Sequence, residues 1–210
     1  MSLVGLIAQA DERGLAASGL ACLDRCLPLL GGDDELLRPL WAGLADGEDG
    51  AAWGERLEQA RRKLGDAGLE EPVEGETGDV PGGGPGAESA AGDEAVRLAR
   101  RMLAAAPPEP AAAELRLWAD ACSVASLRIH ALLGGAAPDE SDAALSGARQ
   151  EGRTEGMSPL VTAELRRQVV VLELLAEHGA GGLRRALEVS TEGRRVLRAV
   201  VSRRARVKRG

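Results

Sequence analysis

The sequence contains no phenylalanine and no tyrosine, and it has only three tryptophans and two isoleucines. Leucine, isoleucine, valine and phenylalanine together supply 47 of the 210 residues, just above the level at which disorder becomes the expected state. A folded core is therefore possible, but it must be built from leucine, valine and alanine. Because strands favour aromatic and β-branched residues, this composition argues against an all-β fold.

Cysteine and long apolar runs are also scarce. Three cysteines and no strict repeat exclude a disulfide scaffold, collagen and a coiled-coil rod. No apolar run reaches the length of about eighteen residues that a membrane span needs, and the N-terminus lacks the basic start of a signal peptide. We expect a cytoplasmic protein with reduced thiols. The 24 arginines against two lysines, with abundant alanine and glycine, indicate a high-GC bacterial genome.

Two stretches divide the chain. Residues 66–92 carry eight glycines, three prolines and seven acidic residues, which cannot bury enough apolar surface to offset the chain entropy. We predict a disordered acidic linker there, between an N-terminal helical lobe (1–65) and a C-terminal helical lobe with a basic end (93–210). A loop is predicted at about 134–157, with a helical turn near residues 142–148. Since each lobe is small, an alternative is that the two lobes share one hydrophobic core.

Elsewhere the apolar residues repeat with the spacing of amphipathic helices, which predicts an all-α, bundle-like fold. The most regular stripe, within residues 115–132, advances by three and four residues in turn. Ser158 and Pro159 predict a helix start, and Gly179 predicts the end of that helix. The remaining predicted N-caps are acidic, at Asp33, Asp34 and Asp93.

The chain offers few residues for catalysis or metal binding. Cys22 and Cys26 lie four residues apart, so a helix places both on one face, but a zinc site would need two further ligands. We expect the cysteines to be small buried residues and predict no metal and no cofactor. His178 falls in the last turn of a predicted helix, where the helix dipole favours a cation.

Motifs of nucleophilic or phosphate chemistry are missing from the sequence. The glycine-rich residues 82–86 lack the lysine and the serine or threonine of a phosphate-binding loop, and no Gly-x-Ser-x-Gly elbow occurs. We therefore predict that the chain has no catalytic residues and is not an enzyme.

Charge is distributed unevenly along the chain. Residues 1–157 hold 14 basic and 28 acidic residues, whereas residues 158–210 hold 12 basic and five acidic residues. A basic end on an acidic body predicts contact with an acidic polymer, usually nucleic acid, or pairing with the chain's own acidic half. Composition leaves both interpretations open.

The basic end also carries a sequence resemblance. The segment Leu183-Arg184-Arg185-Ala186-Leu187-Glu188-Val189-Ser190 is similar to the first helix and turn of a helix-turn-helix, and residues 165–179 look like the helix before it. Residues of about 160–204 thus resemble helix-turn-helix DNA-binding regulators, although Glu188 stands where the turn usually has glycine. The residue pattern predicts two short helices, at about 183–189 and 192–204, and the resemblance implies that residues 191–204 form the recognition helix. The residues then expected to contact DNA are Arg184, Arg185, Arg194, Arg195, Arg198, Arg203 and Arg204.

Two functions follow as expectations. The first is a non-enzymatic helical interaction or regulatory protein with a protein partner, because Leu-rich helices are present and no catalytic motif is. The alternative is a helix-turn-helix-like DNA-binding regulator that uses residues 183–206. The sequence leaves the oligomeric state open.

Overall fold

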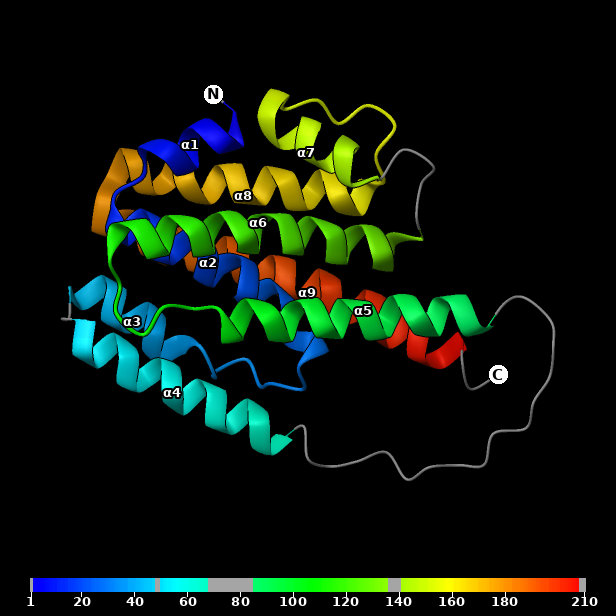
Figure 1. Cartoon of the computed structure of the whole chain (residues 1–210), viewed down its shortest axis with the longest axis horizontal. Helices are drawn as coiled ribbons and strands as arrows, with labels where there is room; N and C mark the ends of the chain where they lie inside the picture. Colours follow the sequence, from blue (N-terminus) through cyan, green and yellow to red (C-terminus); the bar gives the residue numbers. More distant parts are fainter. Residues whose placement is uncertain (1, 48–49, 68–84, 136–140, 208–210) are drawn as a thin grey trace.

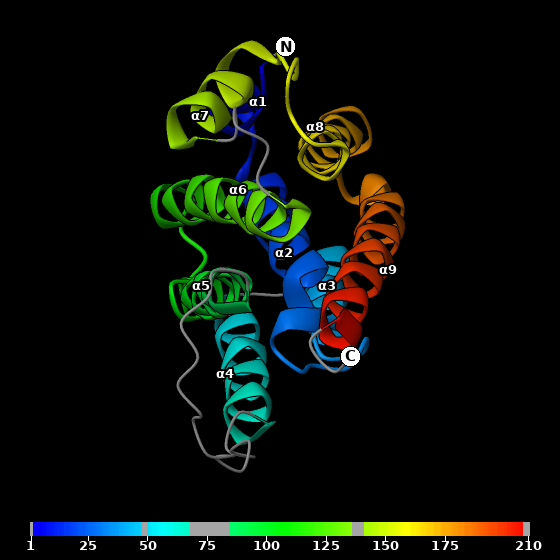
Figure 2. The same ribbon diagram turned by 90° about the vertical axis from the view of Figure 1, so that its right-hand side faces the viewer.

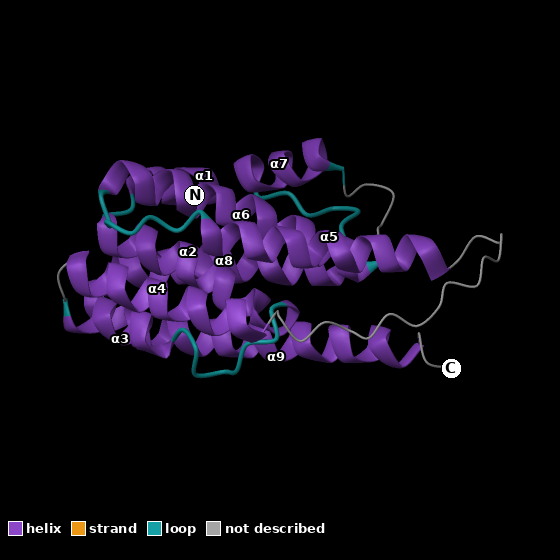
Figure 3. Cartoon of the chain, turned by 60° about the horizontal axis from the view of Figure 1, so that its bottom comes forward, coloured by secondary structure: helices purple, strands orange, loops and turns teal. Residues whose placement is uncertain are grey.

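The computed structural model describes residues 2–47, 50–67, 85–135 and 141–207. Across these ranges the chain forms helices and no strand (Figures 1 and 3), which confirms the all-α prediction. The α-helices are α1 (Leu3–Gln9), α2 (Glu12–Cys26), α3 (Arg38–Asp46), α4 (Gly50–Ala67), α5 (Pro85–Ala104), α6 (Ala112–Gly134), α7 (Asp142–Glu151), α8 (Pro159–His178) and α9 (Leu183–Val207). Two short 3-10 helices, η1 (Leu27–Leu29) and η2 (Gly179–Gly182), follow α2 and α8.

Helix α2 lies at the centre of the bundle. It packs against α6, α8 and α9, which surround it in Figure 2. Its residues from Gly14 to Cys26 are all buried, and many of them are alanine or glycine, so the neighbouring helices approach closely. A Cβ atom at Gly19 would lie 2.6 Å from the ring of Trp118 on α6. The α2–α6 contact therefore leaves no room for a side chain at this position.

The two predicted lobes share one hydrophobic core. Leu20 and Leu57 from residues 1–65 belong to the same buried cluster as Leu115 and Leu165 from the later part of the chain. A core built of leucine and alanine from both halves compensates for the missing phenylalanine and tyrosine.

Helix α4 is fixed against the connection between α5 and α6 by tryptophan. Trp53 and Trp118 meet edge to face, with ring centroids 6.2 Å apart. The Trp53 Nε1–H donates to the carbonyl of Pro107 at 2.8 Å, and the Trp118 Nε1–H donates to the carbonyl of Met102 at 2.9 Å. Both rings thus bury their apolar surface and still satisfy their single polar group.

The predicted ends of α8 agree with the structure. Ser158 caps α8, Pro159 is its first residue, and Gly179 is its C-cap. The predicted helical turn in the loop at 134–157 is confirmed as α7, which continues to Glu151; residues 136–140 of that loop lie outside the described residues.

Three predicted boundaries are wrong. Helix α5 begins at Pro85, within the stretch predicted as a linker, because proline is well accommodated in a first turn and alanines continue the helix. Asp93 is therefore no N-cap. Asp33 and Asp34 do not cap α3, whose N-cap is Leu37. Residues 68–84 of the predicted linker lie outside the described residues.

Replacing Gly19 by alanine tests the close α2–α6 contact. We expect Gly19→Ala to lower the free energy of unfolding by about 1–3 kcal/mol, because the ring of Trp118 cannot move out of the way easily. A Cβ at Gly147 in α7 would meet no atom within 4 Å, so Gly147→Ala should instead stabilise by up to about 1 kcal/mol. Urea unfolding followed by tryptophan fluorescence measures both, and equal effects would contradict the contact.

Candidate functional site

A completely buried ion pair joins α2 to α8. Arg25 donates from Nε and Nη2 to the two carboxylate oxygens of Glu164, at 2.8 and 2.7 Å, and both side chains are 0 % exposed. The same carboxylate accepts hydrogen bonds from Ser126 Oγ on α6 and Gln168 Nε2 on α8, each at 2.8 Å. Arg25 Nη1 also reaches Ser190 Oγ on α9, at 3.5 Å. One ion pair thus connects four helices, and we call these residues the Arg25–Glu164 network.

The network continues along the inner side of α6 to α7. Ser123 Oγ donates to Gln168 Oε1 at 2.6 Å, and Arg149 Nε of α7 donates to Ser123 Oγ at 3.0 Å. Arg149 also forms an ion pair with Asp120, whose side chain is half exposed. The inner side of α6 is therefore held by polar contacts from the core of the bundle to its surface.

Electrostatics keep Glu164 ionised despite its burial. Burial alone would raise the pKa of this carboxyl, but the charge of Arg25 and the hydrogen bonds from Arg25 and Gln168 lower the pKa to about 2. His130 Nε2 lies 3.5 Å from Glu164 Oε2, and its Nδ1 lies 2.7 Å from the carbonyl oxygen of Ser126. Burial lowers the pKa of His130, although Glu164 opposes this effect.

The geometry of the network suits a structural role. Arg25 and Glu164 are 0 % exposed and His130 is 1 % exposed, so a substrate cannot reach them in this conformation. The three cysteines are buried, as predicted. Burial raises the pKa of the Cys22 thiol to about 12, which leaves it protonated and a poor nucleophile. Among the described residues, no group of three or more histidine, cysteine, aspartate or glutamate side chains could hold a metal ion.

Residues 183–207 form one unbroken helix, α9. The prediction of two short helices is therefore wrong. Ser190, at the predicted turn, lies within the helix, where its Oγ donates to the carbonyl of Ala186 at 3.0 Å and accepts a hydrogen bond from Arg25. A helix-turn-helix depends on a turn that sets its second helix at an angle to the first, and α9 has no such turn.

Arg194 and Arg198 bind the chain's own acidic residues. Arg194 is 4 % exposed, and its Nη1 donates to Asp24 Oδ1 at 2.8 Å. Arg198 forms an ion pair with Asp34, which also lies 3.3 Å from Arg194 Nε. Burial raises the pKa of Asp24 to about 6, although Arg194 lowers it. For these two arginines the structure confirms the interpretation in which the basic end pairs with the acidic half.

The other five arginines expected to contact DNA differ in exposure. Arg204 is partly buried and donates to the carbonyl of Leu132 on α6 at 2.8 Å. The remaining four, which are exposed on the outer side of α9, are Arg184, Arg185, Arg195 and Arg203. Arg184 lies 3.3 Å from Glu188 in the same helix. His178 is half exposed in the last turn of α8, where the sequence placed it.

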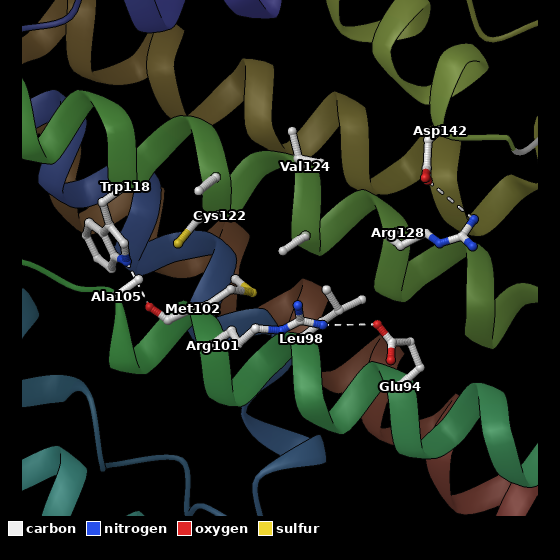
Figure 4. A pocket seen from close by; sticks show the side chains of 12 residues that line it. Glu94, Leu98, Arg101, Met102, Ala105, Trp118, Cys122, Val124, Arg128 and Asp142 are labelled. Atoms are coloured by element: carbon white, nitrogen blue, oxygen red, sulfur yellow. Dashed lines mark hydrogen bonds and ion pairs between the residues drawn. The ribbon is translucent and has the colours of Figure 1, made fainter.

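An open groove of about 650 Å³ lies between α5 and α6 (Figure 4). Its apolar lining comes mainly from Leu98, Met102, Ala105, Trp118, Cys122 and Val124. Two ion pairs stand on its rim: Arg101 with Glu94 at 3.1 Å, and Arg128 with Asp142 at 3.6 Å. The groove thus combines an apolar floor with charges of both signs at its edges.

The solvent side of α6, next to this groove, is apolar as well. Leu117 is 74 % exposed and Val124 is 46 % exposed, and Ala121 between them is also exposed. Their spacing of four and three residues puts them on one side of the helix, with Glu114 and Arg128 two turns before and after Ala121. These five residues are called the α6 face below. Helix α6 thus exposes a short apolar strip to solvent, with a carboxylate at one end and a guanidinium at the other.

Neither the network nor the α6 face is among the sites predicted from the sequence. Ser123, Ser126 and His130 follow one side of α6 at helical spacing, and such a polar stripe beside a core stripe is the pattern that indicates a buried network. Arg25 between two core cysteines is a similar indication. The α6 face could have been found from Leu117 and Val124, which fall outside the apolar stripe of this helix.

Comparison with known proteins gives no guide to function, because no family model, no curated protein and no solved structure matches the chain. Within the part of the chain that the structure describes, no helix has both the length and the apolar character needed to cross a membrane.

Removing one partner of the buried ion pair should lower the free energy of unfolding far more than removing both. We expect Arg25→Met to lower the free energy of unfolding by about 3–5 kcal/mol, because it leaves the Glu164 carboxylate buried without its cation. The double variant Arg25→Met/Glu164→Leu should recover most of that loss. Chemical unfolding of the wild type and both variants measures this, and a double variant as unstable as the single one would contradict the account.

Acid should remove the stabilisation that Glu164 provides. The folded pKa of Glu164, about 2, lies below the ordinary value of 4.5. The contribution of Glu164 to the free energy of unfolding is therefore complete above pH 4.5 and is lost as the pH falls toward 2. Between pH 5 and 2.5 the free energy of unfolding of the wild type should fall by roughly 2 kcal/mol more than that of Arg25→Met/Glu164→Leu. Equal losses in unfolding experiments across this range would show that Glu164 is not the responsible group.

Proposed function

We propose that this chain is a non-catalytic helical interaction protein that binds a partner helix through the α6 face and the adjoining α5–α6 groove. The single observation that carries the proposal is the exposure of Leu117 and Val124 beside an open apolar groove. Water contact with this much apolar surface is unfavourable, and apolar patches of this kind typically mark interaction sites.

The chemistry of the surface favours an amphipathic helix as the partner. Helices bind grooves by inserting apolar side chains spaced three and four residues apart, and the groove floor offers Leu98, Met102 and Trp118 to receive them. Charged residues at the rim, such as Arg101 and Glu94, can form ion pairs with charged residues of the partner. Such rim charges influence specificity more than affinity.

The buried network supports a scaffolding role. Its titratable groups are enclosed, whereas a catalytic group must reach its substrate. By fixing the inner side of α6 through Ser123 and Ser126, the network keeps the opposite side of the helix presented in one orientation. A rigid binding surface loses less entropy when a partner binds.

DNA binding is a second candidate, because Arg184, Arg185, Arg195 and Arg203 are exposed along one helix. Glu188 and Glu192 are interleaved with these arginines, which reduces the attraction for phosphates. If this candidate is correct, a duplex should bind with a steep salt dependence, and replacing the four arginines by glutamine should abolish binding.

A defined helical peptide tests the proposed function. We expect a labelled, alanine-rich amphipathic peptide with leucines at positions i, i+4 and i+7 to bind with a Kd on the order of 10–100 μM, measured by fluorescence anisotropy. Ala121→Arg places a charged side chain at the groove and should weaken binding at least tenfold. Because Ala121 is exposed, this variant should still fold.

The matched control is Ala176→Arg, at an exposed position on α8, which should leave peptide binding unchanged. A peptide whose three leucines are replaced by glutamate should not bind. Peptide binding that is absent, or equally strong in the two arginine variants, would overturn the proposed site.

A further inference from the structure

We propose that the partner helix is α6 of a second copy of this chain, and that the two α6 helices pack antiparallel about a twofold axis beside Ala121. This inference rests on the proposed function, because it names the occupant of the same surface. An interface formed by one patch on both subunits must be complementary to itself. The α6 face meets that requirement in its apolar residues and in its charges.

The apolar residues of the α6 face match across such an axis. Leu117 lies four residues before Ala121 and Val124 lies three residues after it, so an antiparallel arrangement brings Leu117 beside Val124 of the partner subunit. At about 1.5 Å of rise per residue, the two positions differ by only about 1.5 Å along the helix. These are the two most exposed large apolar residues of α6, and the pairing covers both in both copies.

A small residue stands where the two helices would come closest. Ala121 has a single methyl group, which allows the helix axes to approach to about 8 Å, the lower end of the usual range. The apolar side chains on either side of it then meet directly.

The charges of the α6 face select the antiparallel arrangement. Glu114 lies seven residues before Ala121 and Arg128 lies seven residues after it, so each Glu114 falls opposite Arg128 of the partner subunit. A parallel arrangement would instead place Glu114 against Glu114 of the partner subunit, and Arg128 against Arg128 of the partner subunit. Like charges in contact are unfavourable, so the sequence of this face disfavours that alternative.

Arg128 already contacts Asp142 within its own chain, at 3.6 Å. The Arg128 side chain is itself 39 % exposed, so a carboxylate of a second copy can reach its guanidinium. The proposed interface therefore adds a contact for Arg128 to those that it already makes within its own chain.

The groove gives the interface its width. Helix α5 packs beside α6 along the same side of the molecule (Figure 2). A twofold axis perpendicular to α6 therefore sets the two α5–α6 grooves face to face. The apolar floor of each groove, with Leu98 and Met102, is then closed by the partner subunit.

Sedimentation velocity of the full chain tests this inference. We expect the mass to rise from that of the 21.8 kDa monomer toward twice that value as the concentration increases from about 1 to 100 μM. Leu117→Glu should keep the protein monomeric throughout, because it places a carboxylate in the apolar contact twice. The matched control is Val170→Glu on α8, at a position that is 39 % exposed in the monomer, and it should associate like the wild type.

A charge exchange tests the orientation of the two helices. Glu114→Arg and Arg128→Glu should each weaken association at least tenfold, because each creates two contacts between like charges. The double variant Glu114→Arg/Arg128→Glu should restore association. Since Arg128→Glu disturbs the contact with Asp142 equally in the single and double variants, recovery reports only the pairing between subunits.

The outcomes separate this inference from the proposed function. The self-association is overturned if the wild type stays monomeric at 100 μM. It is also overturned if the Leu117→Glu variant associates as strongly as the wild type. If the helical peptide still binds in an Ala121-dependent way, the groove is a binding site for another helix. If the peptide also fails to bind, both proposals fall.

Discussion

The structure depends on one ion pair that is closed off from water. Arg25 and Glu164 are both 0 % exposed, and such a pair is tolerated only when further hydrogen bonds satisfy its remaining polar atoms. Ser126, Gln168 and Ser190 supply these hydrogen bonds from three different helices. The central helix α2, its neighbours α6 and α8, and the basic helix α9 are therefore fixed relative to one another by a single polar centre. Leucine and alanine side chains pack with little directional preference. The hydrogen bonds of the ion pair have a defined geometry, and they fix the orientation of the helices relative to one another.

The two sides of α6 differ from those of an ordinary surface helix. The inner side carries serines and a histidine that belong to the network, while the outer side carries Leu117, Ala121 and Val124. This distribution is consistent with the proposal that α6 lies between its own bundle and a partner. The basic residues of α9 fit the same view, because Arg194 and Arg198 are held by Asp24 and Asp34 within the chain.

Sequence patterns were sufficient for the fold class and for the two ends of α8, because both depend on local chemistry. The stripe in α6 and the caps at Ser158 and Gly179 could be recognised from spacing and residue type alone. The charge pairing of α9 was foreseen only as one of two possibilities. Its continuity at Ser190 was not foreseen, because a serine that bonds back to a carbonyl in its own helix and accepts from Arg25 looks, in sequence, like a turn.

The candidate site could not be predicted in the same way. Arg25 and Glu164 are 139 residues apart in the chain, and nothing local identifies either as a buried partner of the other. The groove exists only because α5 packs on α6 with Met102 and Trp118 between them. Leu117 and Val124 were visible as exceptions to a helical stripe, but only the structure establishes that no other part of the described chain covers them.

The most direct measurement is disulfide formation by Ala121→Cys. A twofold axis beside this position brings the two substituted residues within reach of one another, while the three native cysteines are buried and react slowly. We predict that Ala121→Cys forms a covalent dimer rapidly under mild oxidation, much faster than Ala176→Cys on α8. Cross-linking at equal rates in the two variants would contradict the claim that the α6 face binds a second copy of this chain.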